Sequence, residues 1–184
     1  MQTIIWRVEY TCLPKAVRYC KKCGVKTEFE SSKNFRVNAQ QKYLDVWLIY
    51  KCLRCDSTWN LTLYTRVNPK SLPAEILEGF HSNDEELAAR FSMDTEILRK
   101  NGAEPTLPAY RIVGDAVNLT EAAELRLISE YPSDLKASSV LRENLGISRK
   151  IFDQMLEDGM IKCISGQNLK KCKLHGEIAI QIGS

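Results

Sequence analysis

The order of hydrophobic and polar positions predicts β-strands in the first third of the chain. Residues 57–67 alternate between apolar and polar side chains, which is typical of a strand with one buried face. Residues 43–52 are almost continuously apolar, so we expect that strand to be covered on both faces. Residues 3–11 are rich in β-branched and aromatic side chains and are expected to form a strand leading to a cysteine pair. Shorter strands, separated by a polar turn, are expected at 25–29 and 35–38.

Helical spacing of apolar residues replaces the strand pattern after residue 70. Residues 72–80 are expected to form one short helix. Ser82, Asn83 and Asp84 are expected to provide the cap of a second helix that runs to about Arg90, with Glu85 and Glu86 in its first turn, because carboxylates stabilise helix N-termini. Asp94 is expected to start a third helix, which ends at Asn101-Gly102.

The end of the chain predicts two helices followed by a small sheet. The first helix covers residues 135–145 and stops at Gly146, and the second is capped by Ser148 and ends at Gly159. A short glycine-containing turn between two helices is the outline of a helix-turn-helix. Residues 109–128 show no clear period, except that 124–128 favours a strand. Three further strands are expected at 161–164, 169–174 and 178–182.

Two cysteine pairs supply the strongest chemical signal in the sequence. Cys20 and Cys23 form one Cys-x-x-Cys knuckle, and Cys52 and Cys55 form the other. Two knuckles that face each other present four thiolates, the ligand set of a tetrahedral structural Zn²⁺ site. The 28 residues between Cys23 and Cys52 exceed the commonest spacing of about 15 to 20, so an extra hairpin is expected between the knuckles. Reduced structural cysteines and a redox pair remain the alternatives to zinc.

These patterns together predict an α+β protein in four parts. The expected parts are an antiparallel zinc-ribbon β-sheet domain at residues 1–70, an acidic helical segment at 71–104, a linker with an entering strand at 105–128, and a two-helix module with a small β-sheet at 129–184.

Charge is distributed unevenly along the chain. Residues 1–70 carry 13 basic and 5 acidic side chains, whereas residues 71–128 carry 5 basic and 11 acidic ones. The basic part is compatible with a polyanionic partner such as nucleic acid, and equally with lysines that solvate a small sheet. The chain shows no secretory signal and no apolar stretch of membrane-spanning length. We therefore expect a cytoplasmic protein without a membrane partner, in which paired cysteines are metal ligands.

Catalysis has little support in the sequence. His81 and His175 are the two histidines of the chain, and neither belongs to a recognisable nucleophile–base pair. A zinc ion closed by four thiolates has no open position for water. We expect a protein that is not an enzyme, and we assign no role to the remaining cysteines, Cys12, Cys163 and Cys172, although Cys12 is an alternative ligand of the ribbon.

The start of the last predicted helix suggests a phosphate-binding surface. Arg149 and Lys150 follow the Ser148 cap, where the helix dipole disfavours cations unless an anion is bound. Lys170, Lys171 and Lys173 lie on the neighbouring predicted hairpin and extend the patch. Exposed cations without a partner would explain the same residues equally well. The aromatic residues of the first third, such as Trp47 and Trp59, favour a core role over base stacking.

Residues 145–163 resemble the RNA-binding module named after ribosomal small-subunit protein four. The resemblance rests on Leu145-Gly146-Ile147-Ser148-Arg149-Lys150, on Met155 to Cys163 and on Gly166. It implies an RNA-binding surface formed by Ser148, Arg149 and Lys150 with the preceding helix. The arginine-aspartate pair usual in that first helix is replaced here by the neighbourhood of Lys136-Ala137-Ser138.

The whole chain is similar to a bacterial family catalogued as domain of unknown function 1062. The similarity rests on residues 35–38, 44–52, 71–73 and 83–88, and it implies no activity. The leading hypothesis is therefore a non-enzymatic zinc-ribbon protein that binds structured RNA or a ribosomal complex. The alternatives are a DNA-binding regulator, with residues 149–157 as recognition helix, and a protein-interaction adaptor that binds no nucleic acid.

Overall fold

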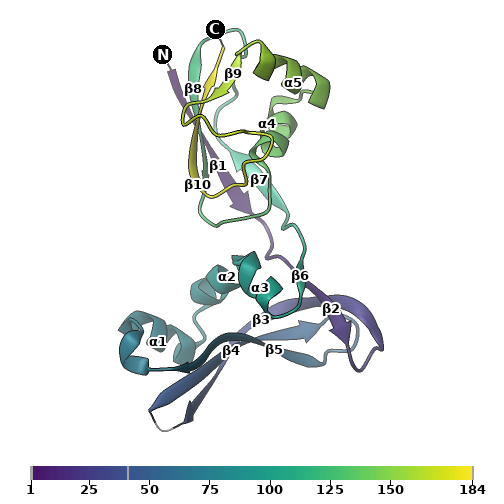
Figure 1. The fold of residues 1–184 in the computed structure, drawn as a ribbon, viewed down its shortest axis with the longest axis vertical. Helices are drawn as coiled ribbons and strands as arrows, with labels where there is room; N and C mark the ends of the chain where they lie inside the picture. Colours follow the sequence, from purple (N-terminus) through teal and green to yellow (C-terminus); the bar gives the residue numbers. More distant parts are fainter. Residues whose placement is uncertain (1, 41, 184) are drawn as a thin grey trace. The chain divides into compact units, whose positions relative to one another are not determined.

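The computed structural model describes residues 2–40 and 42–183 and has an α+β fold. Within these residues ten strands form two five-stranded sheets, accompanied by five α-helices and one short 3-10 helix (Figure 1). The chain divides into two compact units. We call residues 2–11 and 109–183 the outer unit, and residues 12–108, which interrupt it in sequence, the inserted unit.

The outer unit contains a mixed sheet in which distant parts of the sequence are neighbours. The strand order is β7-β1-β8-β10-β9, with a parallel pairing between β1 and β8 and antiparallel pairings elsewhere. Helices α4 and α5 lie on one side of this sheet (Figure 1). The elements are β1 (Gln2–Tyr10), β7 (Tyr110–Val113), β8 (Ala123–Ser129), α4 (Ala137–Leu145), α5 (Arg149–Glu157), β9 (Ile161–Cys163) and β10 (Gly176–Ile182).

The core of the outer unit forms where the two helices cover the sheet. Side chains alternate along β1 and β8, so that Trp6 and Leu127 are buried on the helix-covered face. Phe152 of α5 and Leu141 of α4 complete the apolar cluster. The indole N–H of Trp6 donates to the carbonyl of Asp115 at 2.8 Å, which satisfies the polar atom of this large buried side chain.

The outer unit changes the predicted domain boundaries. The strand at residues 2–10 was assigned to the N-terminal domain, but it pairs with β8 and β7 of the outer unit. Residues 105–128, predicted as a linker with an entering strand, contain β7, an edge strand, and most of β8, the central strand of the sheet. Local patterns missed this arrangement because a parallel pairing joins segments more than 100 residues apart.

The segment at residues 169–174 is a helix cap and not the predicted strand. Helix α4 starts without a side-chain cap, and the N–H groups of Ala137 and Ser138 donate instead to the carbonyls of Cys172 (2.9 Å) and Leu169 (3.2 Å). Asn168 holds the segment in a turn, because its side-chain oxygen accepts from the N–H of Lys170 at 3.0 Å. A single bridge between Lys136 and Lys173 is all that remains of the expected pairing in the described residues.

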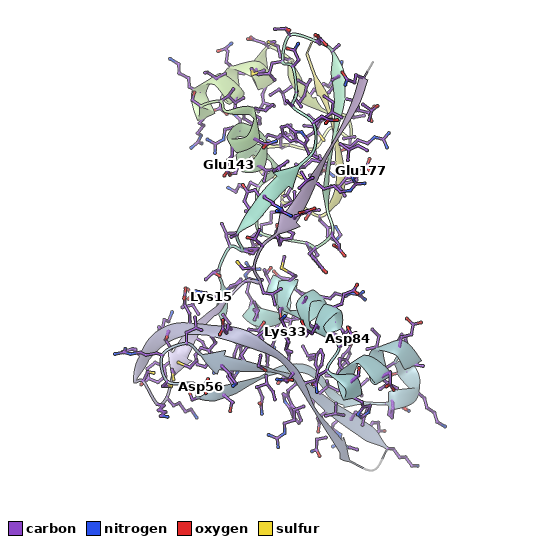
Figure 2. The ribbon with its side chains drawn as sticks, turned by 180° about the vertical axis from the view of Figure 1, so that it is seen from behind. Lys15, Lys33, Asp56, Asp84, Glu143 and Glu177 are labelled. Atoms are coloured by element: carbon purple, nitrogen blue, oxygen red, sulfur yellow. The ribbon has the colours of Figure 1, made fainter. Side chains whose placement is uncertain are left out.

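The inserted unit is built on an antiparallel sheet with the order β5-β4-β3-β2-β6. Three short helices follow the sheet in sequence, and Asp84 caps the second of them by accepting a hydrogen bond from Leu87 N–H at 2.6 Å (Figure 2). The elements are β2 (Ala16–Cys20), β3 (Val25–Gln40), β4 (Tyr43–Cys52), β5 (Thr58–Val67), a 3-10 helix (Pro69–Ser71), α1 (Ala74–Ser82), α2 (Glu85–Met93), α3 (Thr95–Lys100) and β6 (Glu104–Pro105).

Two strand predictions in the inserted unit are wrong in detail. The strands expected at 25–29 and 35–38 are one long strand, β3, whose register shifts between Ser31 and Phe35. The polar residues between them form an irregularity with Lys33 at a φ of 61°, so the chain bulges without turning back. Strand β4 alternates between buried and half-buried or exposed positions and is therefore fully covered on one face only.

The core of the inserted unit lies between the sheet and its three helices. Leu48, Tyr50 and Leu61 are fully buried on the sheet, and Phe80 and Leu98 cover them from the helices. The unit begins and ends at neighbouring points, because Thr11 N–H donates to the carbonyl of Ala109 at 2.9 Å. Within the described residues, no helix has the length and apolar composition needed to cross a membrane.

Candidate metal centre

The two Cys-x-x-Cys knuckles adopt the same local turn. In the first, Gly24 N–H donates to the carbonyl of Cys20 at 2.9 Å, and in the second Asp56 N–H donates to Cys52 at the same distance. Both turns need a left-handed residue after the second cysteine, and φ is 71° at Gly24 and 58° at Asp56. Glycine adopts this conformation without a steric cost, and aspartate tolerates it better than most side chains. The repeated turn aims both cysteines of each pair in one direction.

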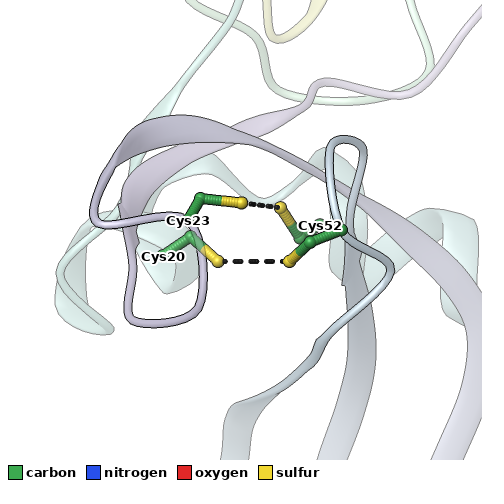
Figure 3. Close-up of side chains that lie close together, drawn as sticks. Cys20, Cys23 and Cys52 are labelled. Carbon is green, nitrogen blue, oxygen red and sulfur yellow. Dashed lines mark hydrogen bonds between the residues drawn. The ribbon is translucent and has the colours of Figure 1, made fainter.

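The four cysteine sulfurs converge on one point between the knuckles. All four lie within 4.8 Å of one another, with 3.5 Å between the Sγ atoms of Cys20 and Cys55 and 3.9 Å between those of Cys23 and Cys52 (Figure 3). Four sulfurs about 2.3 Å from a tetrahedral zinc ion would stand about 3.8 Å apart. A disulfide would require about 2.05 Å, and all four cysteines are free. The four residues predicted as ligands could therefore hold a metal ion such as zinc.

Ser57 is a part of the centre that the sequence analysis missed. Its hydroxyl lies 3.1 Å from the sulfur of Cys55 and 3.4 Å from that of Cys20. A hydroxyl that donates to ligating sulfurs orients them and stabilises their charged form. The available signal was its position two residues after the last cysteine, at the point where the second knuckle returns to the sheet. Cys12, considered as an alternative ligand, does not belong to the group.

In the absence of a cation, hydrogen bonds shift the pKa values of three of the thiols in opposite directions. The Ser57 hydroxyl, followed by the backbone of Cys23, lowers the pKa of Cys20 to about 6. Ser57 also lowers the pKa of Cys55. The hydrogen bond with Cys55, followed by burial, raises the pKa of Cys23 to about 12, because a thiol that donates to a thiolate gives up its proton reluctantly. A divalent cation would stabilise all four thiolates together.

Arg149 and Lys170, two of the residues predicted to bind nucleic acid, lie around one carboxylate in the outer unit. Ser148 accepts a hydrogen bond from Ile151 N–H at 3.3 Å and so caps α5 as predicted. Lys170 pairs with Asp153 at 2.8 Å, and Arg149 approaches the same carboxylate at 3.9 Å. Lys170 also lowers the pKa of Asp153 by its hydrogen bond. The two cations therefore meet although they are 21 positions apart.

These two cations line a small cleft beside the start of α4. The cleft has a volume of about 160 Å³ and is also lined by Lys136, Arg142 and the serines at 138 and 139. It thus combines four cations with one carboxylate, Asp153. The sequence analysis missed Lys136 and Arg142 as site residues, although their spacing places them within two turns of the same helix.

The remaining predicted cations lie outside this cleft. Lys150 is exposed on the outer face of α5, beside Glu157 and Gln154. Lys173 pairs with Asp134 at 2.6 Å, and Lys171 lines a separate hollow with His175. The structure therefore brings together Arg149 and Lys170, but not all five predicted cations.

The family model described as "Protein of unknown function (DUF1062)" matches residues 37–167 of this chain. The match covers more than two thirds of the 184 residues, begins after the first knuckle and ends before Lys170. It includes Cys52, Cys55 and three of the four cations of the cleft. No curated protein and no solved structure matches the chain.

Proposed function

The chain belongs to the DUF1062 family, and because that description names no activity, we propose a function from the two sites themselves. The protein is a non-enzymatic RNA-binding protein in which the inserted unit is a zinc ribbon and the outer unit contacts phosphates of a structured RNA, either free or in a ribosomal complex. The observation that carries the proposal is the cleft in which four cations surround a single carboxylate.

The zinc ion has a structural role in this proposal. Four cysteine ligands complete a tetrahedral shell, so no position is left at which the ion could activate water. The knuckles lie at the ends of the β2–β3 and β4–β5 turns, and a shared ion would tie these two hairpins together. Expected ligands are Cys20, Cys23, Cys52 and Cys55, and the Ser57 hydroxyl, with one proton to donate, lies within hydrogen-bond distance of the sulfurs of Cys20 and Cys55.

The cleft has the features of a phosphate site. Arginine offers a planar fork of donors that matches a phosphate, and lysine adds a flexible point charge. The hydroxyls of Ser138 and Ser139 add neutral hydrogen-bonding groups to the lining. Asp153 holds Lys170 and Arg149 in place without RNA, and a bound phosphate would share them with the carboxylate. The resemblance of residues 145–163 to the RNA-binding module supports the same surface.

The proposal is tested by the salt dependence of RNA binding. The zinc-loaded protein is compared with an Arg149→Ala, Lys170→Ala double variant on a set of structured RNAs and on duplex DNA. Each lost phosphate contact should reduce the slope of log K against log salt by about one unit, so the double variant should lose about two units and at least tenfold in affinity.

A matched control removes the same charge elsewhere in the outer unit. Arg111 pairs with Glu9, and Arg126 pairs with Glu124 and Glu177, and none of these residues lines the cleft. An Arg111→Ala, Arg126→Ala variant should bind RNA within about twofold of the parent protein. Equal binding by the cleft variant and the control would contradict the proposal. Preferential binding of duplex DNA would favour the regulator hypothesis, and no binding at low salt would favour the adaptor.

A further inference from the structure

A larger pocket lies in the inserted unit, directly beside the metal centre. It has a volume of about 450 Å³, within the range of small-molecule sites. Cys20 and Ser57 form one wall, so the pocket and the sulfur cluster share residues. Its other walls are contributed mainly by Arg18, Lys21, Lys22, Thr58, Trp59 and Asn60.

A guanidinium lies over an indole ring in this pocket. The Cζ atom of Arg18 is 4.0 Å from the ring centroid of Trp59 and 5.9 Å from that of Phe29. Trp59 itself makes an edge contact with Phe29 (6.0 Å between ring centroids) and a tilted contact with Tyr50 (5.4 Å). The guanidinium therefore rests on a rigid aromatic cluster, and cation–π attraction replaces an ion pair as its anchor.

Arg18 has no carboxylate counter-ion among the described residues, although the charge of Cys20 interacts with it favourably. Its Nη1 atom is buried without a hydrogen-bond partner, and no described carboxylate lies within ion-pair distance of it. Burial lowers the pKa of Arg18, but a guanidinium remains protonated at neutral pH. A buried donor without an acceptor is costly, so this arrangement favours an anionic ligand that approaches the same group.

The pocket remains positive when the metal centre is included. A zinc ion with four thiolates carries a formal charge of about −2, and Arg18, Lys21 and Lys22 outweigh it. Among the residues that the structure describes, no aspartate or glutamate lines the pocket. Lys22 donates to the carbonyl of Cys55 at 3.5 Å, which keeps its ammonium close to the knuckles.

We propose that this pocket binds a nucleotide, with the phosphate against Arg18, Lys21 and Lys22 and the base stacked on the layer formed by Arg18 and Trp59. Bases stack on guanidinium planes as well as on aromatic rings, so the Arg18–Trp59 layer offers a surface for one. Asn60 and Thr58 provide an amide and a hydroxyl at the edge of that layer, where the base would present its polar groups.

The nucleotide could be free or an unpaired residue of a nucleic acid. The pocket belongs to a different unit from the phosphate cleft, and the inference does not depend on RNA binding there. If an oligonucleotide is the source, the pocket extends the proposed function with a contact for a single strand. If a free nucleotide is the source, the inserted unit is a small-molecule binding unit.

The test follows the indole N–H signals of the zinc-loaded full-length protein by ¹H–¹⁵N NMR. Trp6, Trp47 and Trp59 give three signals, and a Trp59→Phe variant assigns the third. AMP should shift the Trp59 signal in a saturable way and leave that of Trp6 unchanged. Adenosine and inorganic phosphate should each bind at least tenfold more weakly than AMP. A five-residue oligoadenylate that binds at least tenfold more tightly than AMP would identify nucleic acid as the source.

Substitutions test whether Arg18 contributes to AMP binding in this pocket. Arg18→Gln should weaken AMP binding at least tenfold with zinc content unchanged. Lys26→Gln should leave it within twofold, because Lys26 pairs with Glu104 at 3.0 Å and does not line the pocket. If Arg18→Gln fails to retain zinc, a Lys21→Gln, Lys22→Gln variant on the exposed knuckle takes its place with the same expected loss.

Two results would overturn the inference. The first is the absence of a Trp59 shift with both AMP and oligoadenylate at millimolar concentration, and the second is undiminished AMP binding by the Arg18 or lysine variants. The Arg149→Ala, Lys170→Ala variant distinguishes failure of this inference from failure of the proposed RNA-binding function. It should lose structured-RNA binding and keep the Trp59 response to AMP.

Discussion

The two units of this protein are stabilised by different means. The outer unit has a continuous apolar core, in which one face of a five-stranded sheet is covered by two helices. The inserted unit covers part of its sheet with three short helices and ends in four converging cysteines. Among the residues that the structure describes, these cysteines form the single group with metal-ligand spacing. From this comparison we expect the outer unit to depend on burial alone and the inserted unit to depend also on a metal ion.

The junction between the units makes the comparison testable. The hydrogen bond from Thr11 N–H to the carbonyl of Ala109 joins the two points at which the inserted unit begins and ends. An unfolded insert would therefore act as a long loop between two strands of the outer unit. Closing a loop of about 100 residues costs about 4 kcal/mol by the logarithmic law, which a domain with a complete core can tolerate.

The largest expected effect comes from metal removal. Structural zinc sites contribute about 10 kcal/mol or more to folding, so chelation of the purified protein should unfold the inserted unit. Hydrogen exchange measured by mass spectrometry should then show loss of protection in β3, β4 and β5 and retained protection in β8 and β10. A Cys20→Ser, Cys52→Ser variant should reproduce this pattern without a chelator.

Two results would contradict the expected loss of exchange protection in the inserted unit alone. Simultaneous loss of protection in both units would show that they fold as one cooperative body. Unchanged protection after complete metal removal would show that the apolar cluster around Leu48 and Phe80 suffices for the inserted unit. A Cys163→Ser variant is the matched control, because Cys163 is buried in the outer unit and lies outside the group of four.

An effect of intermediate size, on metal affinity, is expected from substitution of Ser57. Ser57→Ala removes the hydroxyl that lies within hydrogen-bond distance of the sulfurs of Cys20 and Cys55, and loss of such a partner weakens metal binding by about 10- to 100-fold. Competition with a chromophoric chelator measures this loss. Ser71→Ala, an exposed substitution at the 3-10 helix of the same unit, should leave zinc affinity unchanged. Equal zinc affinities of the Ser57→Ala and Ser71→Ala variants would show that Ser57 does not contribute to metal binding.

The sequence predicted the features that depend on short stretches of chain. Two cysteines on one turn and the cap at Ser148 follow from a few neighbouring residues, and the structure contains both. Asp84 and Asp94 start helices for the same reason. Local chemistry is sufficient wherever the interacting groups are also sequence neighbours.

The sequence did not predict features that depend on distant contacts. The first strand was placed in the wrong unit because its partner, β8, lies beyond the whole insert. The segment 169–174 looked like a strand, yet its carbonyls are needed by the uncapped start of α4. The sequence did not single out Arg18, because neither its position over Trp59 nor its unpaired nitrogen is visible before the sheet is assembled.

The smallest effect is expected from a glycine-to-alanine substitution, which can be made at a matching position in each unit. Gly24 of the first knuckle and Gly146 after α4 have similar φ values, 71° and 65°, and a Cβ atom at either position would meet nothing within 4 Å. Alanine at either site would therefore cost only backbone strain of about 1–2 kcal/mol, reduced by about 0.4–1 kcal/mol because the unfolded chain loses freedom. Each variant should lose about 1 kcal/mol.

The two substitutions should change different measured quantities. Gly24→Ala should weaken zinc affinity by about fivefold and leave exchange protection of the outer unit unchanged, because its strain is relieved only when the knuckle opens. Gly146→Ala should lower the unfolding midpoint of the outer unit and leave zinc affinity unchanged. A drop in outer-unit stability caused by Gly24→Ala would show that strain at the metal centre crosses the junction at Thr11 and Ala109, and the two units would then share one folding equilibrium.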